Sequence, residues 1–260
     1  MEFTVTIDDK QVQVNENATI LDAAQKAGIW IPTLCYHPAI SCHATCRICM
    51  VELDRGGWTQ FVTACNYPVR KDIIVRVNSP GAIQARRGVM ELILARVPES
   101  EEIIELAKKM GVERTPYPNV TESQRNCILC GLCVRVCEEI IGVSAISFAG
   151  RGVERIVSTP FMQASEDCIG CGACAAVCPV GTIRLRYYKD SNEIEISPFK
   201  TRKPLLTCSE CGKLMISSEV NVKLFRNLTI DIDEFKERLA YCPECKRKKT
   251  AKGLSITVVP

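Results

Sequence analysis

The sequence contains no apolar stretch of about 20 residues, the length a membrane-spanning helix requires, so no transmembrane segment is predicted. Its first residues lack a basic segment followed by an apolar run, so we expect no secretory signal and a cytoplasmic location. Basic and acidic residues nearly balance at a formal net charge of +3. This charge gives no independent case for a nucleic-acid or membrane partner.

Motifs for nucleotide binding and for hydrolytic chemistry are also missing. There is no G-x-G-x-x-G and no phosphate-binding loop, so no flavin or nicotinamide site is evident. No Ser–His–acid or paired-carboxylate arrangement is indicated either. The two histidines, His37 and His43, are too few to supply most metal ligands. We therefore predict no catalytic residues on this chain and expect thiolates to bind any metal.

Cysteine is the residue present in excess, with 17 in 260 residues. A reducing compartment disfavours disulfides, which leaves metal binding as the main interpretation. Ligation by thiolates alone suits iron–sulfur clusters and structural zinc. The length and a hydrophobic content of 47% allow two to four small domains.

The region 119–190 contains an internal repeat in which a C-x₂-C-x₂-C-x₃-C run occurs twice. Three closely spaced thiolates can hold one [4Fe–4S] cube while the fourth reaches the other cube. The first cluster is expected on Cys127, Cys130, Cys133 and Cys178. The second cluster is expected on Cys168, Cys171, Cys174 and Cys137. Gly131, Gly170 and Gly172 would let the backbone approach the cubes. The alternative is a pair of zinc knuckles, which do not need four cysteines per run. The region resembles the two-cluster bacterial ferredoxins.

The N-terminal region contains four cysteines with the spacing C-x₁₀-C-x₂-C-x₁₅-C. Three thiolates on one loop and a distant fourth can clamp a [2Fe–2S] rhomb. The expected ligands are Cys35, Cys46, Cys49 and Cys65. Cys42 is a competing choice, because Cys42-x₃-Cys46-x₂-Cys49 comes within one residue of the plant ferredoxin spacing. A Rieske centre would use Cys35-Tyr-His37, but its C-x-x-H half is missing, so both histidines are interpreted as loop residues or neighbours of the cluster.

The sequence around these cysteines resembles a family of iron–sulfur subunits. The phrases are Ile31-Pro-Thr-Leu-Cys35-Tyr-His, Cys46-Arg-Ile-Cys49-Met-Val-Glu and Thr63-Ala-Cys65-Asn. They are similar to the [2Fe–2S] domain that opens the large iron–sulfur subunit of respiratory complex I, and to subunits of NAD-linked hydrogenases and formate dehydrogenases. The resemblance covers about residues 1–190 and implies a β-grasp fold for the first domain. The family often carries another [4Fe–4S] cluster, on one histidine and three cysteines. No cysteine lies between Cys65 and Cys127, so that cluster is expected to be absent.

We expect an α+β protein with four regions. Alternation of apolar residues predicts a hairpin of two strands over residues 3–14, and Thr19 can cap a helix that ends near Gly28. Residues 1–78 would form the [2Fe–2S] domain, and 79–118 a helical linker with a second helix capped by Ser100. Residues 119–190 would form the dicluster ferredoxin domain, and 200–260 a zinc-ribbon-like tail.

The tail contains two C-x₂-C turns that can direct four thiolates to one tetrahedral ion. These residues are Cys208, Cys211, Cys242 and Cys245. We expect zinc here, and the alternative is a third [4Fe–4S] cluster. A strand over 220–222 and a helix over 232–239 are predicted between the two turns.

The expected function follows from the resemblance. It implies an electron-relay subunit of a multi-subunit oxidoreductase that connects a flavin- and NAD(P)-binding partner with a second redox subunit or ferredoxin. Hydrogenase, formate dehydrogenase and electron-bifurcating transhydrogenase complexes are all candidates. A stand-alone ferredoxin-like carrier is the alternative. A metal protein that binds nucleic acid through the basic run at 246–249 is a third possibility.

Overall fold

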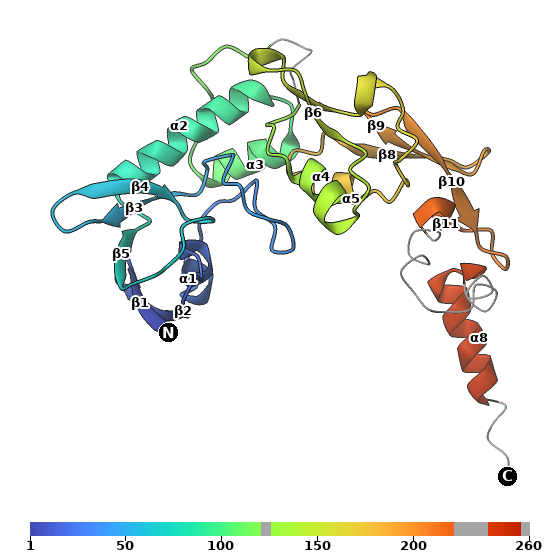
Figure 1. The fold of residues 1–260 in the computed structure, drawn as a ribbon, viewed down its shortest axis with the longest axis horizontal. Helices are drawn as coiled ribbons and strands as arrows, with labels where there is room; N and C mark the ends of the chain where they lie inside the picture. Colours follow the sequence, from blue (N-terminus) through green and yellow to red (C-terminus); the bar gives the residue numbers. More distant parts are fainter. Residues whose placement is uncertain (121–125, 221–238, 256–260) are drawn as a thin grey trace. The chain divides into compact units, whose positions relative to one another are not determined.

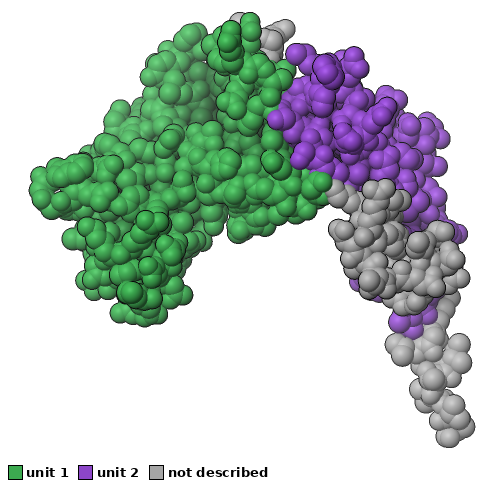
Figure 2. Space-filling view, in the orientation of Figure 1, with its two compact units in different colours: residues 1–142, 148–157, 177–182 green, residues 143–147, 158–176, 183–260 purple. Residues whose placement is uncertain are grey.

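The computed structural model describes residues 1–120, 126–220 and 239–255 (Figure 1). The chain divides into two compact units, coloured separately in Figure 2. Unit 1 comprises residues 1–142, 148–157 and 177–182. Unit 2 comprises residues 143–147, 158–176 and 183–260. The chain therefore leaves unit 1 and returns to it for a short segment that includes Cys178.

Unit 1 begins with a five-stranded mixed sheet in the order β2-β1-β5-β3-β4. The strands are β1 (Glu2–Ile7), β2 (Lys10–Asn15), β3 (Met50–Asp54), β4 (Thr59–Thr63) and β5 (Ile73–Arg76). β1 and β2 form the predicted antiparallel hairpin, and β1 also pairs in parallel with β5. The alternating side chains Val5, Ile7, Val12 and Val14 are all buried in one core with the helix α1. The period-two pattern of the sequence therefore predicts which face of the hairpin is buried.

Helix α1 (Ile20–Lys26) begins where the sequence predicts it. The Thr19 hydroxyl accepts a hydrogen bond from the Asp22 amide, and the Asp22 carboxylate accepts one from the Thr19 amide. This reciprocal arrangement is a capping box, which satisfies two amides that a helix start leaves unpaired. Gly28 follows the helix with a positive φ of 67°, a conformation that glycine adopts without steric cost.

The linker region forms two helices, α2 (Pro80–Arg96) and α3 (Glu101–Lys109). Ser79 and Ser100 cap them through side-chain hydrogen bonds, as the sequence predicts for Ser100. Their apolar faces share a second core with Ile48, which lies between two cysteines of the first domain, and with Val180, which follows Cys178. The helices thus pack against segments from both cysteine-rich regions of unit 1.

Several short elements follow the two linker helices along the chain. Helix α4 (Leu132–Arg135) runs directly into the π-helix η2 (Val136–Ile140). The strands β6 (Ser147–Ala149) and β7 (Ile156–Ser158) pair with each other, with the 3₁₀-helix η3 (Gly152–Glu154) between them.

Unit 2 is built on a four-stranded antiparallel sheet in the order β11-β10-β9-β8. The strands are β8 (Arg184–Tyr188), β9 (Glu193–Ser197), β10 (Thr201–Thr207) and β11 (Leu214–Ser217). Ile194, Ile196 and Leu205 are buried. The 3₁₀-helix η4 (Pro160–Met162) and the helix α5 (Ala173–Ala176) precede the sheet, and α8 (Pro243–Ser255) follows it. This sheet was not predicted from the sequence.

The mixture of sheets and helices confirms the predicted α+β class. The strand expected over 220–222 begins at Val220, which is helical, and its other two residues lie outside the described part. The helix expected over 232–239 also lies outside it, except for Leu239. Within residues 1–120, 126–220 and 239–255, the structure contains no helix that is both long and apolar enough to cross a membrane.

The capping box generates a prediction about stability. Thr19→Ala removes the hydroxyl that accepts from the Asp22 amide, so the free energy of unfolding of unit 1 should fall by about 1 kcal/mol. Anaerobic thermal unfolding followed by circular dichroism should show a lower melting temperature. Gln25→Ala, an exposed change in the same helix, is the control. Equal melting temperatures for the two variants would contradict the role of the cap.

Candidate metal centres

The four cysteines of the first domain come together from three segments of unit 1. Cys35 and Cys46 lie in the long loop between α1 and β3, Cys49 directly precedes β3, and Cys65 follows β4. Cys35, Cys49 and Cys65 are buried and Cys46 is half-buried. The Sγ atoms of Cys49 and Cys65 are 3.3 Å apart, and the Cys46 amide donates to the Cys35 Sγ at 3.4 Å. The thiol of Cys35 is also hydrogen-bonded with those of Cys46 and Cys65, so the four sulfurs form one group, as a cluster held by four thiolates requires.

Hydrogen bonds among these four thiols shift the pKa of each. Hydrogen bonds with the thiols of Cys46 and Cys65 lower the pKa of Cys35 to about 2. The hydrogen bond with Cys65 likewise lowers the pKa of Cys49 to about 7. The same contacts, together with burial, raise the pKa of Cys46 and Cys65 above the ordinary thiol value. Cys35 and Cys49 therefore lose their protons more easily than an ordinary thiol, whereas Cys46 and Cys65 keep theirs. A cationic centre among them would let all four ionise, so the donor set fits a [2Fe–2S] cluster.

Cys42 lies close to this group. It is half-buried against the core of the first domain, and its hydrogen bond with Cys65 contributes to the raised pKa of Cys65. The structure therefore brings both Cys35 and Cys42 to Cys65. The histidines make local contacts, since His37 Nδ1 accepts from the Ala39 amide and His43 Nε2 lies 3.4 Å from the Ser41 hydroxyl.

The first [4Fe–4S] set lies entirely within unit 1. Cys127 and Cys130 precede α4, Cys133 lies in α4, and Cys178 lies in the segment that returns from unit 2. Burial raises the pKa of Cys127 and raises that of Cys130 to about 11, and the charge of Cys178 contributes to both increases. Cys178 is thus close enough to Cys127 and Cys130 for its charge to act on both, and the crossed ligand set stays a prediction from spacing. Burial disfavours the thiolate forms of these groups, and a bound metal centre would keep them ionised.

The charge of Cys35 also contributes, after burial and after the charges of Cys127 and Cys178, to the raised pKa of Cys130. A ligand predicted for the [2Fe–2S] cluster is therefore close enough to affect a ligand predicted for the first [4Fe–4S] cluster. Both residues, Cys35 and Cys130, belong to unit 1.

The backbone conformation of these loops directs amide groups toward the cysteine sulfur atoms. The Leu129 amide donates to the Cys127 Sγ at 3.4 Å, and Leu129 has a positive φ of 52°. Gly131 has a positive φ of 75° at the start of α4. Amides aimed at sulfur stabilise its negative charge, and strained or glycine positions permit that orientation.

The residues predicted for the second [4Fe–4S] cluster are found in different units. Cys137 lies in η2 of unit 1, and the other three predicted ligands lie in unit 2 around the start of α5: Cys168, Cys171 and Cys174. A Cβ atom on Gly172 would lie 2.9 Å from the Leu185 side chain, and one on Gly170 would lie 2.9 Å from the Lys203 Cβ. These glycines allow the cysteine loop to pack closely on the sheet of unit 2. The set as a whole stays a prediction from spacing.

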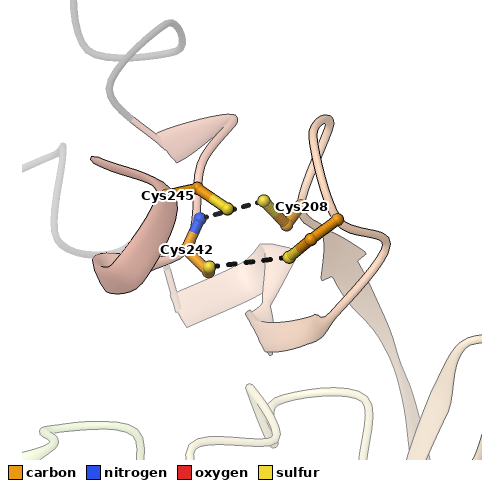
Figure 3. A group of neighbouring side chains, drawn as sticks. Cys208, Cys242 and Cys245 are labelled. Carbon is orange, nitrogen blue, oxygen red and sulfur yellow. Dashed lines mark hydrogen bonds between the residues drawn. The ribbon is translucent and has the colours of Figure 1, made fainter. Parts of the chain in front are cut away.

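The tail cysteines converge within unit 2 (Figure 3). Cys208 and Cys211 lie in the turn between β10 and β11, and Cys242 and Cys245 lie at the start of α8. Their four sulfur atoms all lie within 4.8 Å of one another, and three of the residues are buried while Cys211 is exposed. The Sγ atoms of Cys211 and Cys242 are 3.7 Å apart. The Cys242 amide donates to the Cys208 Sγ at 3.3 Å and is the main reason that the pKa of Cys208 falls to about 6.

This spacing matches one ion better than a cube. Zn–S bonds of about 2.3 Å in a tetrahedron separate the sulfurs by about 3.8 Å. In a cube each thiolate binds a different iron, which spreads the sulfurs further apart.

Two arginines that sequence reasoning missed also belong to these sites. Arg96, at the end of α2, donates to the Cys127 carbonyl at 2.6 Å. Arg135, at the end of α4, donates to the carbonyls of Cys35 and Cys130. Their sequence neighbourhoods carry no motif, because each contact joins residues distant in sequence or depends on the fold of a loop.

Comparisons with known proteins agree with this organisation. Residues 1–80 match the family described as a 2Fe-2S iron-sulfur cluster binding domain, and residues 126–182 match the 4Fe-4S dicluster domain. The chain thus carries a [2Fe–2S] domain followed by a [4Fe–4S] dicluster domain, in the order the sequence predicts.

Among characterised relatives, the chain is 30% identical over 182 residues to the NADH-ubiquinone oxidoreductase 78 kDa subunit of Neurospora crassa, covering 61% of this chain and 24% of that protein. It is 33% identical to the NADPH-Fe(3+) oxidoreductase subunit alpha of Geobacter sulfurreducens, over 60% of this chain and 21% of that protein. It is also 33% identical to the NADP-reducing hydrogenase subunit HndD of Solidesulfovibrio fructosivorans, over 60% of this chain and 31% of that protein. The chain thus spans less than a third of each of these relatives.

Among solved structures, a chain of an NAD⁺-reducing [NiFe]-hydrogenase in the H₂-reduced state superposes with a TM-score of 0.55 and 29% identity. The match covers 69% of this chain and 85% of that chain. The predicted resemblance to iron–sulfur subunits of NAD(P)-linked oxidoreductases is confirmed.

The competition between Cys35 and Cys42 generates a prediction. Cys35→Ser should abolish the [2Fe–2S] EPR signal of the reduced protein, because Cys35 is buried and hydrogen-bonded with the thiols of Cys46 and Cys65, whereas Cys42 is only half-buried. Cys42→Ser, the matched control from the same loop, should retain the signal. The reverse pair of results would make Cys42 the ligand.

Proposed function

We propose that this chain is the electron-relay subunit of a multi-subunit oxidoreductase. It would hold one [2Fe–2S] and two [4Fe–4S] clusters and carry single electrons between a flavin- and NAD(P)-binding partner and a second redox subunit or ferredoxin. The observation that carries the proposal is the packing of the [2Fe–2S] loop and the first [4Fe–4S] run inside one unit, against the shared helices α2 and α3. Clusters work in series only when they lie close together, and their potentials depend on burial and hydrogen bonding.

The relatives support the NAD(P) link. Their printed names include an NADH-ubiquinone oxidoreductase, an NADPH-Fe(3+) oxidoreductase and an NADP-reducing hydrogenase, and the structural neighbour is an NAD⁺-reducing hydrogenase. Within the sequence itself, no nucleotide-binding motif is evident. A partner with flavin is therefore the expected source or acceptor of hydride-derived electrons.

The ligand sets and domains proposed for this function are those predicted from spacing. Residues 1–78 would be the β-grasp [2Fe–2S] domain, a proposal supported by the hairpin, the helix α1 and the mixed sheet. Residues 79–118 would serve as a helical linker in place of the histidine–cysteine cluster of the family. Residues 119–190 would hold the two cubes with their crossed fourth ligands.

For the tail we propose a structural zinc site in a zinc-ribbon-like domain. The support is the clustering of four thiols within 4.8 Å and the 3.7 Å separation of Cys211 and Cys242. The site joins the turn after β10 to the start of α8. A metal bound here would stabilise a region in which Cys208, Cys242 and Cys245 form the buried centre.

The relay function predicts a specific pattern of reduction. The chain purified anaerobically from its native cells should carry a stoichiometric flavoprotein. NADH or NADPH should then reduce the clusters, so that the EPR signals of reduced [2Fe–2S] and [4Fe–4S] clusters appear. The chain alone, fully loaded, should not be reduced by either nucleotide, because it supplies no hydride acceptor. A loaded chain recovered without any flavoprotein and active as a diffusible carrier would instead support the ferredoxin-like alternative.

The tail site predicts the metal content. Anaerobic analysis should find about ten iron atoms and one zinc per chain. Cys245→Ser should lose the zinc and keep the iron, whereas Ser209→Ala, in the same turn as two of the ligands, should keep both. About fourteen irons without zinc would assign a third cube to the tail.

A further inference from the structure

Arg135 occupies an unusual position for a cation. It is only 4% exposed, and it lies at the end of α4 between the loop of Cys35 and the run of Cys130. A buried charge costs several kcal/mol unless it is hydrogen-bonded and compensated by opposite charge. The contacts of this side chain therefore call for an explanation.

The guanidinium group donates to carbonyl oxygens on both sides. On the side of the first [4Fe–4S] run, Nη2 donates to the Cys130 carbonyl at 3.2 Å and Nε to the Gly131 carbonyl at 3.3 Å. On the side of the [2Fe–2S] loop, Nη2 donates to the Cys35 carbonyl at 3.3 Å and Nη1 to the Ser41 carbonyl. The planar group with five donors thus links two residues predicted as ligands of different clusters.

A second contact strengthens the same junction. The amide and the hydroxyl of Ser41 both donate to the carboxylate of Glu139, which lies in η2 one turn after Arg135. Ser41 is thus bound through its amide, hydroxyl and carbonyl by two consecutive turns. The loop of the first domain is held against the helical segment of the dicluster domain at one point.

The charge of Arg135 matches what the two sites would hold. Four thiolates around a [2Fe–2S] or [4Fe–4S] core leave a net charge of about −2 in the oxidised forms. The guanidinium donates to the backbone of both predicted ligand runs, so it would lie near both anionic centres. The clusters would then compensate its burial, and reduction of either one would strengthen that attraction.

We propose that Arg135 is the positioning residue that joins the [2Fe–2S] loop to the first [4Fe–4S] run. By holding the two runs together, it would allow one electron to pass directly between these two clusters. The proposal rests on the proposed function, since it assumes the two ligand sets. The step is the transfer of one electron, in which one cluster is oxidised as the other is reduced, and no bond or proton is exchanged. Because the histidine–cysteine cluster of the family is not expected here, this route would be the exit from the [2Fe–2S] site.

The test separates the geometry of Arg135 from its charge. Arg135→Lys keeps the charge but loses the planar fork, and Arg135→Gln loses both. The control is Arg86→Lys, a buried arginine in α2 that donates to the Met50 carbonyl at 2.9 Å and does not join two cysteine runs. All variants are prepared anaerobically and analysed for iron and sulfide.

The first measurement is EPR power saturation of the [2Fe–2S] signal in the dithionite-reduced protein, where a nearby reduced [4Fe–4S] cluster speeds relaxation. The half-saturation power should fall several-fold in both Arg135 variants and stay at the wild-type value in Arg86→Lys. The second measurement is a redox titration. Arg135→Gln should shift both midpoint potentials to more negative values, because a cation that stabilised the reduced forms is lost, whereas Arg135→Lys should largely preserve them.

Wild-type relaxation and potentials in fully loaded Arg135 variants would overturn the proposal and leave the relay function standing. Should Arg135→Gln fail to load its clusters, Arg135→Lys decides by its half-saturation power alone. A wild-type protein without [2Fe–2S] and [4Fe–4S] signals would instead overturn the function on which the proposal rests.

Discussion

The structure depends on one electrostatic constraint, which is that thiol groups packed against one another cannot all become anions unless a cation lies among them. In the first domain, Cys35 and Cys49 have lowered pKa values while their neighbours Cys46 and Cys65 have raised ones. In the tail, the pKa of Cys208 falls to about 6, and hydrogen bonding led by the thiol of Cys211 raises that of Cys245 to about 12. The same division of protons in the two sites supports the metal-binding role proposed for both.

The helices α2 and α3 link this chemistry to the fold. Their core contacts Ile48, between Cys46 and Cys49, and Val180, next to Cys178. Arg96 at the end of α2 binds the Cys127 carbonyl, and the Ser100 hydroxyl at the start of α3 binds the Val180 carbonyl. The helices α2 and α3, which contain no cysteine, therefore support the cysteine loops of both cysteine-rich regions of unit 1. They do so through apolar packing and through hydrogen bonds to the backbone of these loops.

Much of this organisation could be predicted from local patterns. The hairpin of β1 and β2 follows from alternation, α1 and α3 from Thr19 and Ser100, and the cluster regions from cysteine spacing, since each of these signals lies within a few residues. The four-stranded sheet of unit 2 was missed because the sequence of β8, Arg-Leu-Arg-Tyr-Tyr, has too little apolar alternation to predict a strand. The contacts of Arg135 were missed because they bring Cys35 and Ser41 to a residue far along the chain. The choice between Cys35 and Cys42 depends on a loop whose shape no spacing rule determines.

The order of the ligands along the chain has a consequence for how the protein is made. The four thiols of the first domain are all available once synthesis has passed Cys65, and their sheet is complete soon afterwards at β5. The first run of the dicluster domain, in contrast, would wait for its predicted fourth ligand Cys178, which is made only after the chain has passed through part of unit 2. During translation the nascent chain would therefore present a complete [2Fe–2S] site to maturation factors while the first [4Fe–4S] site still lacks one ligand. Synthesis of the segment 177–182 would complete that second site.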